Sequence, residues 1–125
     1  MLPVAIDAMG GDKAPAEIVE GARRARDELE VPVVLVGIPD EMGDVGDLDV
    51  IACTEAIPMD ADPARSVRTM KDSSLVRAAE AVRDGRAGAM VSAGNTGATM
   101  GAALFRMGRT KGVNRPAIAT PVPSL

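Results

Sequence analysis

The stretch at residues 31–36 reads Val-Pro-Val-Val-Leu-Val, and it constrains the fold more than any other part of the chain. A strand with one face in water alternates apolar and polar side chains, whereas a strand covered on both faces is apolar throughout. Continuous apolar strands are typical of parallel sheets, because the crossover helices cover both faces. The run ends at Gly37. The sequence therefore predicts a short central strand with helices on either side.

The segment before this run predicts one of those helices, over residues 14–29. Ile18, Ala22, Ala25 and Leu29 stand at offsets of 0, 4, 7 and 11, which places them on one helical face. We therefore expect these four side chains to pack on the sheet.

The remaining periodicity favours one α/β domain over residues 1–125, with three layers (α/β/α) and a largely parallel sheet. Residues 39–47 have no clear period, and the last expected helix has hardly any polar side, so we expect it to be buried. The expected strands are 3–8, 31–36, 48–52, 87–93 and 115–119, and the expected helices are 14–29, 61–70, 72–84 and 95–107.

The composition is that of a folded domain: 125 residues, 46% hydrophobic and 26% charged. Phe105 is the only aromatic residue, which opposes nucleic-acid binding, since single-strand readers stack bases on aromatic rings. The single cysteine, Cys53, excludes an internal disulfide and favours a reducing compartment. No apolar run reaches 18 residues, and Asp7 interrupts the N-terminal apolar stretch. We therefore expect a cytoplasmic protein without a membrane span.

The charges are unevenly distributed within a net charge of −4. Residues 1–84 hold all 18 acids and nine basic residues, whereas residues 85–125 hold five basic residues and no acid. Such asymmetry can form a positive face for an anionic ligand, or it can be a set of solvated arginines. The chain has no His and no Cys/His cluster, which excludes a His-based triad and opposes a zinc site. We expect neither a metal nor a cofactor, and we expect Cys53 to be an inert core residue.

Ligands of open parallel sheets collect at the carboxyl ends of the strands, and the first candidate segment there is residues 7–12. Gly10 and Gly11 let the backbone approach a ligand closely. Asp12 either contacts that ligand or caps the following helix. Gly10, Gly11 and Asp12 are thus candidate substrate-binding residues.

The second candidate is the turn at residues 91–97, between an expected strand and an expected helix. Backbone amides at a helix start, beside hydroxyl and amide side chains, suit phosphate, although the spacing is neither a Walker A loop nor a dinucleotide-binding turn. Alternatively, Gly97 and Gly101 only permit close helix packing. The candidate phosphate-binding residues are Ser92, Gly94, Asn95, Thr96 and Gly97.

The third candidate is the helix start formed by Lys71, Asp72, Ser73 and Ser74, which we include among the binding residues. Asp72 or Ser73 can cap the helix. Lys71 is one of only three lysines. Because Asp7 ends a strand and Lys71 opens a helix, we expect both to face one cleft, and we predict that both are catalytic.

These segments resemble the signatures of the PlsX family of acyl-[acyl carrier protein]:phosphate acyltransferases, in the same order and spacing. The resemblance rests on AIDAMGGD at residues 5–12 with AP and IVEG behind it, KDSS at 71–74, SAGNTGA at 92–98 and RTKGVNRPAI at 109–118. It covers nearly the whole chain. The clearest departure is at residues 38–47, where family members carry a longer helical stretch.

The resemblance implies an enzyme that transfers a long-chain acyl group from acyl carrier protein to inorganic phosphate, making acyl phosphate for phosphatidic acid and phospholipid synthesis. It also implies a fold similar to isocitrate dehydrogenase and phosphotransacetylase, and a homodimer that associates peripherally with the membrane. Family chains are more than twice this length. We therefore expect residues 1–125 to be an N-terminal part, truncated just after a core strand begins and inactive alone. The alternatives are a phosphotransacetylase-like enzyme that uses acyl-CoA, and a non-catalytic fragment.

Overall fold

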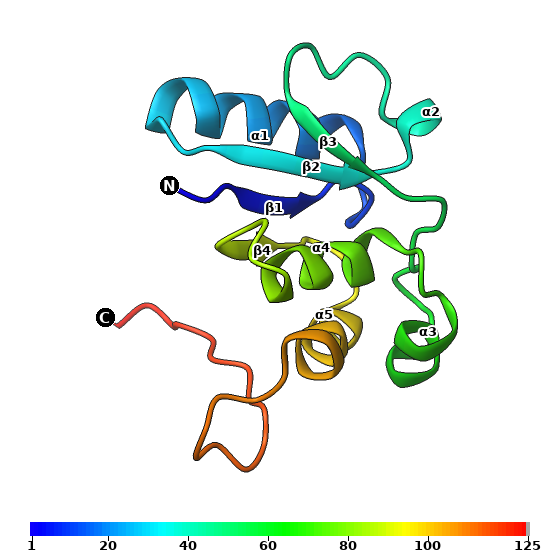
Figure 1. The fold of residues 1–125 in the computed structure, drawn as a ribbon, viewed down its shortest axis with the longest axis vertical. Coiled ribbons are helices and arrows are strands. Elements are labelled where there is room, and N and C mark those ends of the chain that lie inside the picture. The colour runs from blue at the N-terminus through cyan, green and yellow to red at the C-terminus, as the bar shows by residue number, and fades with distance from the viewer. Residues whose placement is uncertain (125) are drawn as a thin grey trace.

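A computed structural model describes residues 1–124, and its centre is a four-stranded sheet in which every pair of neighbours is parallel (Figure 1). The strand order is β3-β2-β1-β4. The predicted α/β class with a parallel sheet and helices on both faces is confirmed. The strands are β1 (Val4–Asp7), β2 (Val33–Gly37), β3 (Asp49–Ala52) and β4 (Ala89–Val91).

The helices form layers on both sides of this sheet. Figure 1 shows α1 above the sheet, α4 directly below it, and α3 and α5 beyond α4. Helix α5 continues directly into a π-helical turn, η1. The helices are α1 (Ala16–Leu29), α2 (Pro39–Met42), α3 (Pro63–Thr69), α4 (Ser74–Arg83), α5 (Thr96–Ala102) and η1 (Ala103–Met107).

Strand β2 is buried along its whole length, as its unbroken apolar sequence predicts. Val33 and Leu35 belong to the core under α1, whereas Val34 and Val36 belong to the core against α4. Because side chains alternate between the faces of a strand, one apolar run supplies both layers.

The strand order makes β1 the point where the chain switches the side of the sheet to which it adds strands. From β1 the chain passes through α1 to β2 and β3 on one side, and it returns later to place β4 on the other side. Ile6 of β1 pairs in register with Val91 of β4. The segments that follow β1 and β4 are therefore neighbours, at a topological switch point where ligands of open α/β sheets bind.

Two sequence predictions about helix burial are wrong in part. In α1 the buried residues are Val19 and Ala22, while Leu29 is 70% exposed, because Glu30 adopts a left-handed conformation directly after it and reverses the chain. The segment 95–107 is not one buried α-helix. Seven α-helical residues are followed by five π-helical residues, and Phe105 is 49% exposed.

The predicted strand at residues 115–119 is also wrong. Residues 108–124 contain neither helix nor strand, and all of them are exposed. Pro116, Pro121 and Pro123 carry no N–H group, so this segment is poorly suited to a sheet ladder. Residues 39–47, which have no clear period, contain only the single turn α2, anchored by the buried Met42.

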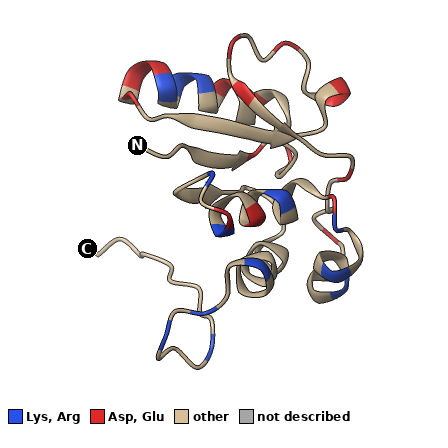
Figure 2. Ribbon diagram, viewed as in Figure 1, with Lys and Arg blue, Asp and Glu red and all other residues tan. Residues whose placement is uncertain are grey.

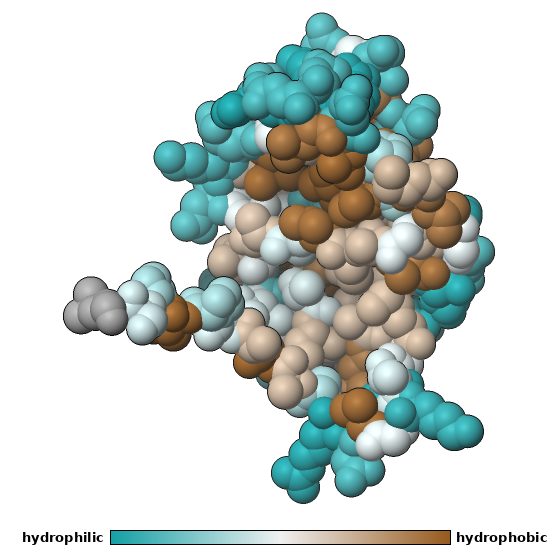
Figure 3. Space-filling view, turned by 90° about the vertical axis from the view of Figure 1, so that its left-hand side faces the viewer, coloured by the Kyte–Doolittle hydropathy of each residue, from teal (hydrophilic) through white to brown (hydrophobic). Residues whose placement is uncertain are grey.

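One face of the sheet is only partly covered. A groove of about 390 Å³ runs between α1 and the β1–β4 side, and Val91 in β4 is 56% exposed. Figure 3 shows apolar side chains gathered below the hydrophilic residues of α1. No helix within residues 1–124 is both long and apolar enough to cross a membrane.

Candidate functional site

The carboxyl group of Asp7 joins the three predicted segments at the switch point. It is 1% exposed. Its Oδ1 accepts hydrogen bonds from Ser74 Oγ at 2.5 Å and from the Met9 amide at 3.1 Å, and its Oδ2 accepts one from Ser92 Oγ at 2.7 Å. The end of β1, the start of α4 and the turn after β4 therefore meet at one buried acid, which we call the Asp7 cluster.

The backbones around this cluster approach so closely that only glycine fits. A Cβ added to Gly10 would lie 2.5 Å from Asp7 Oδ2 and 2.9 Å from the Gly94 amide nitrogen. A Cβ added to Gly94 would lie 3.1 Å from the Gly10 Cα. Gly11 has a φ of +110°, which residues with a side chain rarely adopt. These glycines thus allow a close backbone approach between two segments of this chain, while the predicted close approach to a ligand stays a prediction.

Ser92 is held in one orientation by two hydrogen bonds. It donates to Asp7 and accepts from the Gly94 amide at 3.0 Å. Within the described residues, the N–H groups of Asn95, Thr96 and Gly97 donate to no protein acceptor. The turn thus has a fixed hydroxyl on its inner side and unused backbone donors at its end.

Asn95 and Gly97 have clear structural roles. Asn95 caps α5 by accepting from the Ala98 amide at 3.0 Å, and a Cβ on Gly97 would come within 2.7 Å of Pro63. The close-packing alternative for Gly97 is therefore supported. The side-chain amide of Asn95 donates to three carbonyl oxygens of the loop before α3, those of residues 58, 59 and 61.

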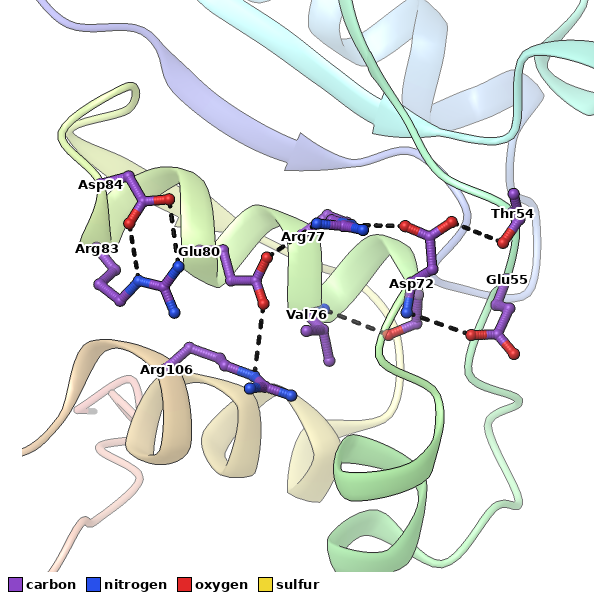
Figure 4. A network of polar contacts seen from close by, with 10 residues as sticks. Thr54, Glu55, Asp72, Val76, Arg77, Glu80, Arg83, Asp84 and Arg106 are labelled. Carbon is purple, nitrogen blue, oxygen red and sulfur yellow. Dashed lines mark hydrogen bonds and ion pairs between the residues drawn. The ribbon is translucent and has the colours of Figure 1, made fainter.

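The segment at residues 71–74 divides between the cluster and the surface. Ser74 binds Asp7, and Ser73 caps α4 by accepting from the Val76 amide at 3.3 Å. Asp72 points the other way: it pairs with Arg77 at 2.5 Å and accepts from the Thr54 hydroxyl at 2.6 Å (Figure 4). The structure thus separates Asp72 from the Asp7 cluster.

Two predicted site residues are exposed. Lys71 makes no side-chain hydrogen bond or ion pair within residues 1–124. Asp12 does not cap α1, because the residue at the cap position is Pro15 and no side chain bonds to that helix end. Capping therefore does not explain Asp12.

A groove of about 460 Å³ opens beside the turn that follows β4. Ser92, Gly94 and Thr96 line its end beside the turn. Most of the remaining lining residues are apolar, and Thr99, Arg109 and Thr110 add polar groups among them. Sequence reasoning missed these wall residues, although the signal was present: a helix without a polar side has more apolar surface than its core contacts need. The apolar wall includes Met90, Met100, Ala103, Leu104, Val113 and Ile118.

Cys53 follows β3 and lies outside this site. It is buried, and burial raises the pKa of its thiol to about 11. A thiol with so high a pKa carries almost no thiolate at neutral pH, which agrees with its predicted role as an inert core residue.

Comparisons with known proteins give the chain its family. The model of a family described as "Fatty acid synthesis protein" matches residues 2–125. A protein named phosphate acyltransferase from Heliobacterium modesticaldum is 49% identical over 131 residues, covering 98% of this chain and 39% of the relative. Proteins of the same name from Desulfitobacterium hafniense and Leuconostoc mesenteroides are each 48% identical and cover 100% and 98% of this chain.

These relatives are considerably longer than the sequence described. The chain spans 39% of the Heliobacterium and Desulfitobacterium proteins and 37% of the Leuconostoc protein. The family model and the relatives nevertheless match nearly the whole length of the chain, which includes the segments of the Asp7 cluster and the turn after β4. The chain therefore belongs to the fatty acid synthesis protein family of phosphate acyltransferases, the PlsX family that its four motifs resemble.

Proposed function

We propose that the protein is a phosphate acyltransferase that transfers a long-chain acyl group from acyl carrier protein to inorganic phosphate. The product is an acyl phosphate that feeds phosphatidic acid and phospholipid synthesis. The observation that carries this proposal is the groove of about 460 Å³, polar beside the turn after β4 and mostly apolar along α5 and η1. A fatty acyl thioester has the same division, with a polar reacting end and an apolar chain.

The chemistry needs little beyond binding and orientation. A phosphate oxygen attacks the thioester carbonyl, the C–S bond breaks, and the carrier leaves as a thiol that takes the proton from hydrogen phosphate. Phosphate is already ionised at neutral pH, so the protein needs to align it with the carbonyl and stabilise the oxyanion that forms. A site without His is compatible with this reaction.

We assign different roles to the predicted site residues. Thr96 and the unused backbone N–H groups at residues 95–97 hold phosphate, and Gly94 keeps the turn open. Asp7 is buried and has three donors, so we propose that it positions Ser74 and Ser92 and does not touch substrate. Lys71 is exposed and remains a candidate catalytic cation for the phosphate or the oxyanion.

In the alternative function, a phosphotransacetylase-like reaction, the acyl group comes from acyl-CoA and not from acyl carrier protein, and phosphate is still the acceptor. The groove accepts the acyl chain of either thioester, so the discriminating measurement is the ratio of kcat/KM for acyl carrier protein and CoA donors of equal chain length. We also keep as proposals the homodimer, the cytoplasmic location with peripheral membrane association, and the inactivity of residues 1–125 alone.

The proposal is tested by blocking each end of the groove in the complete protein. Met100→Trp should abolish activity with palmitoyl donors and keep most activity with butyryl donors. The indole ring of the new tryptophan fills apolar space that a long acyl chain needs and a short one does not. Thr96→Val should raise the KM for phosphate by at least about tenfold, since a hydrogen bond to an anion contributes roughly 1.5–3 kcal/mol. The control is Thr69→Val, on α3 and outside the groove. Equal effects of Met100→Trp on both chain lengths would contradict the assignment.

A further inference from the structure

The exposed cations of the described chain divide into two groups. On α1 and at the end of α4 they have acidic partners, as in Arg24–Glu28 at 2.9 Å and Arg83–Asp84 at 2.8 Å. On α3, Arg65 and Arg68 have no acidic partner within 4.0 Å among residues 1–124, and the same holds for single cations elsewhere, such as Lys13 and Arg86. An exposed cation without an intramolecular partner keeps its charge available for another molecule.

Arg65 and Arg68 stand on a helix that has no acid of its own, although Asp62 caps its start. The sequence has no acid at residues 63–71 and none after Asp84. Figure 2 shows acidic and basic residues mixed on α1 and α4, whereas α3, η1 and the segment after η1 carry basic residues only. Positive charge is therefore concentrated on one part of the surface, although the net charge of the protein is −4.

An aromatic ring lies at the centre of this basic face. The guanidinium group of Arg68 lies 5.5 Å from the centroid of the Phe105 ring, and Phe105 is 49% exposed. The contact joins α3 to η1, and we call Arg65, Arg68 and Phe105 the α3–η1 surface. Arginine and aromatic residues are the types enriched where protein interfaces concentrate their binding energy.

The α3–η1 surface is mechanically joined to the turn that holds the proposed phosphate. Pro63, the first residue of α3, packs on Gly97, and Asn95 holds the loop before α3 through three carbonyl oxygens. Ser66 and Val67 fix the inner side of α3 in the core. A partner bound to the outer side of α3 is thus held at a constant position relative to the groove.

We propose that the α3–η1 surface docks an acidic protein partner, which is the carrier that presents the acyl thioester to the groove. The inference rests on the proposed function for the identity of that partner. Charge complementarity indicates a carrier whose docking face bears carboxylates. A lipid surface fits less well, because Phe105 is the one aromatic ring of this surface and is only 49% exposed, which leaves little apolar area to insert among acyl chains.

The test reverses both arginines in the complete protein, in the double variant Arg65→Glu/Arg68→Glu. We expect the KM for palmitoyl acyl carrier protein to rise about tenfold, with a weaker salt dependence, as for charges at an interface rim. Kinetics with palmitoyl-pantetheine, which lacks the carrier, should stay within about twofold, since the groove is untouched. The matched control is Arg24→Glu/Arg83→Glu, which reverses two exposed arginines elsewhere.

Several outcomes would overturn the docking surface: an unchanged KM for the carrier donor, an equal loss with palmitoyl-pantetheine, or an equal effect in the control. Sedimentation with phosphatidylglycerol vesicles tests whether the surface binds a membrane instead. If the double variant loses vesicle binding and keeps its KM for the carrier donor, the surface binds lipid. The proposed function fails separately, if the wild-type protein makes no acyl phosphate. In that case surface plasmon resonance still tests the docking surface by measuring the Kd for the carrier protein. The double variant should bind the carrier about tenfold more weakly than the wild type.

Discussion

Two aspartates attach loops to the start of α4, and they do so in opposite environments. Asp7 is 1% exposed and accepts from Ser74, Ser92 and the Met9 amide. The side chain of Asp72 is 32% exposed and bonds to Thr54 and Arg77 (Figure 4). The bond lengths are similar. Water can replace the partners of Asp72 but not those of Asp7, so burial decides how much each network stabilises the fold.

The outer network continues past Asp72 and becomes partly buried, since the side chains of Glu80 and Arg106 are 15% and 23% exposed. Arg77 also pairs with Glu80 at 3.2 Å, and Arg106 on η1 approaches Glu80 at 3.8 Å (Figure 4). The side chain of Arg77 is 41% exposed, so solvent screens its pairs with Asp72 and Glu80. The Asp7 cluster thus organises the site, whereas the Asp72 network tethers the surface around it.

The strongest test of this comparison is the same conservative change at both aspartates. Asp7→Asn places an N–H group opposite donors in a site closed to water, so we expect a loss of roughly 2–4 kcal/mol in unfolding free energy. Asp72→Asn should cost less than about 1 kcal/mol. Urea denaturation of the two variants measures both values. Equal losses would show that burial does not separate the networks.

A change of intermediate size concerns the backbone contact beside Asp7. Gly10→Ala forces a methyl group to within 2.5 Å of Asp7 Oδ2, so we expect a loss of about 1–3 kcal/mol and weaker activity in the complete protein. The control is Gly21→Ala within α1, where nothing lies within 4 Å of the added carbon. That substitution should stabilise by about 0.5–1 kcal/mol. A tolerated Gly10→Ala would mean that β1 and the turn after β4 can separate.

The smallest expected effect is the pH dependence of the outer network. The hydrogen bond from Thr54, followed by that from Arg77, holds the pKa of Asp72 below its usual value. The stabilisation is therefore present at neutral pH and is lost as the pH falls through the lowered pKa of the folded state. The difference in stability between the wild type and Asp72→Asn should shrink across that acidic range. A difference that stays constant down to pH 2 would contradict the assigned cause.

Much of the fold could be predicted because its signals are local. The apolar run at residues 31–36 predicts the buried β2, and the expected helix at 72–84 contains α4. The carboxyl ends of strands correctly indicated where Asp7 and Ser92 would lie. The failures occurred where local pattern does not decide the environment. One is Leu29, whose position depends on where α1 ends, and another is the segment 115–119, which is exposed and forms no strand.

The sequence alone determined the sheet type, the polar ends of the strands and the family. It did so because periodicity, turn residues and motif order are properties of short segments. Only the tertiary structure decided that β4 lies beside β1, that Ser74 and Ser92 share Asp7, and that Asp72 faces outward. Those outcomes depend on pairing between segments as much as 85 residues apart, as for Asp7 and Ser92. The sequence does not say which hydroxyl a carboxyl group will bind, because water satisfies both groups in the unfolded chain. The partners become fixed only when packing excludes water, as it does around Asp7 and does not around Asp72.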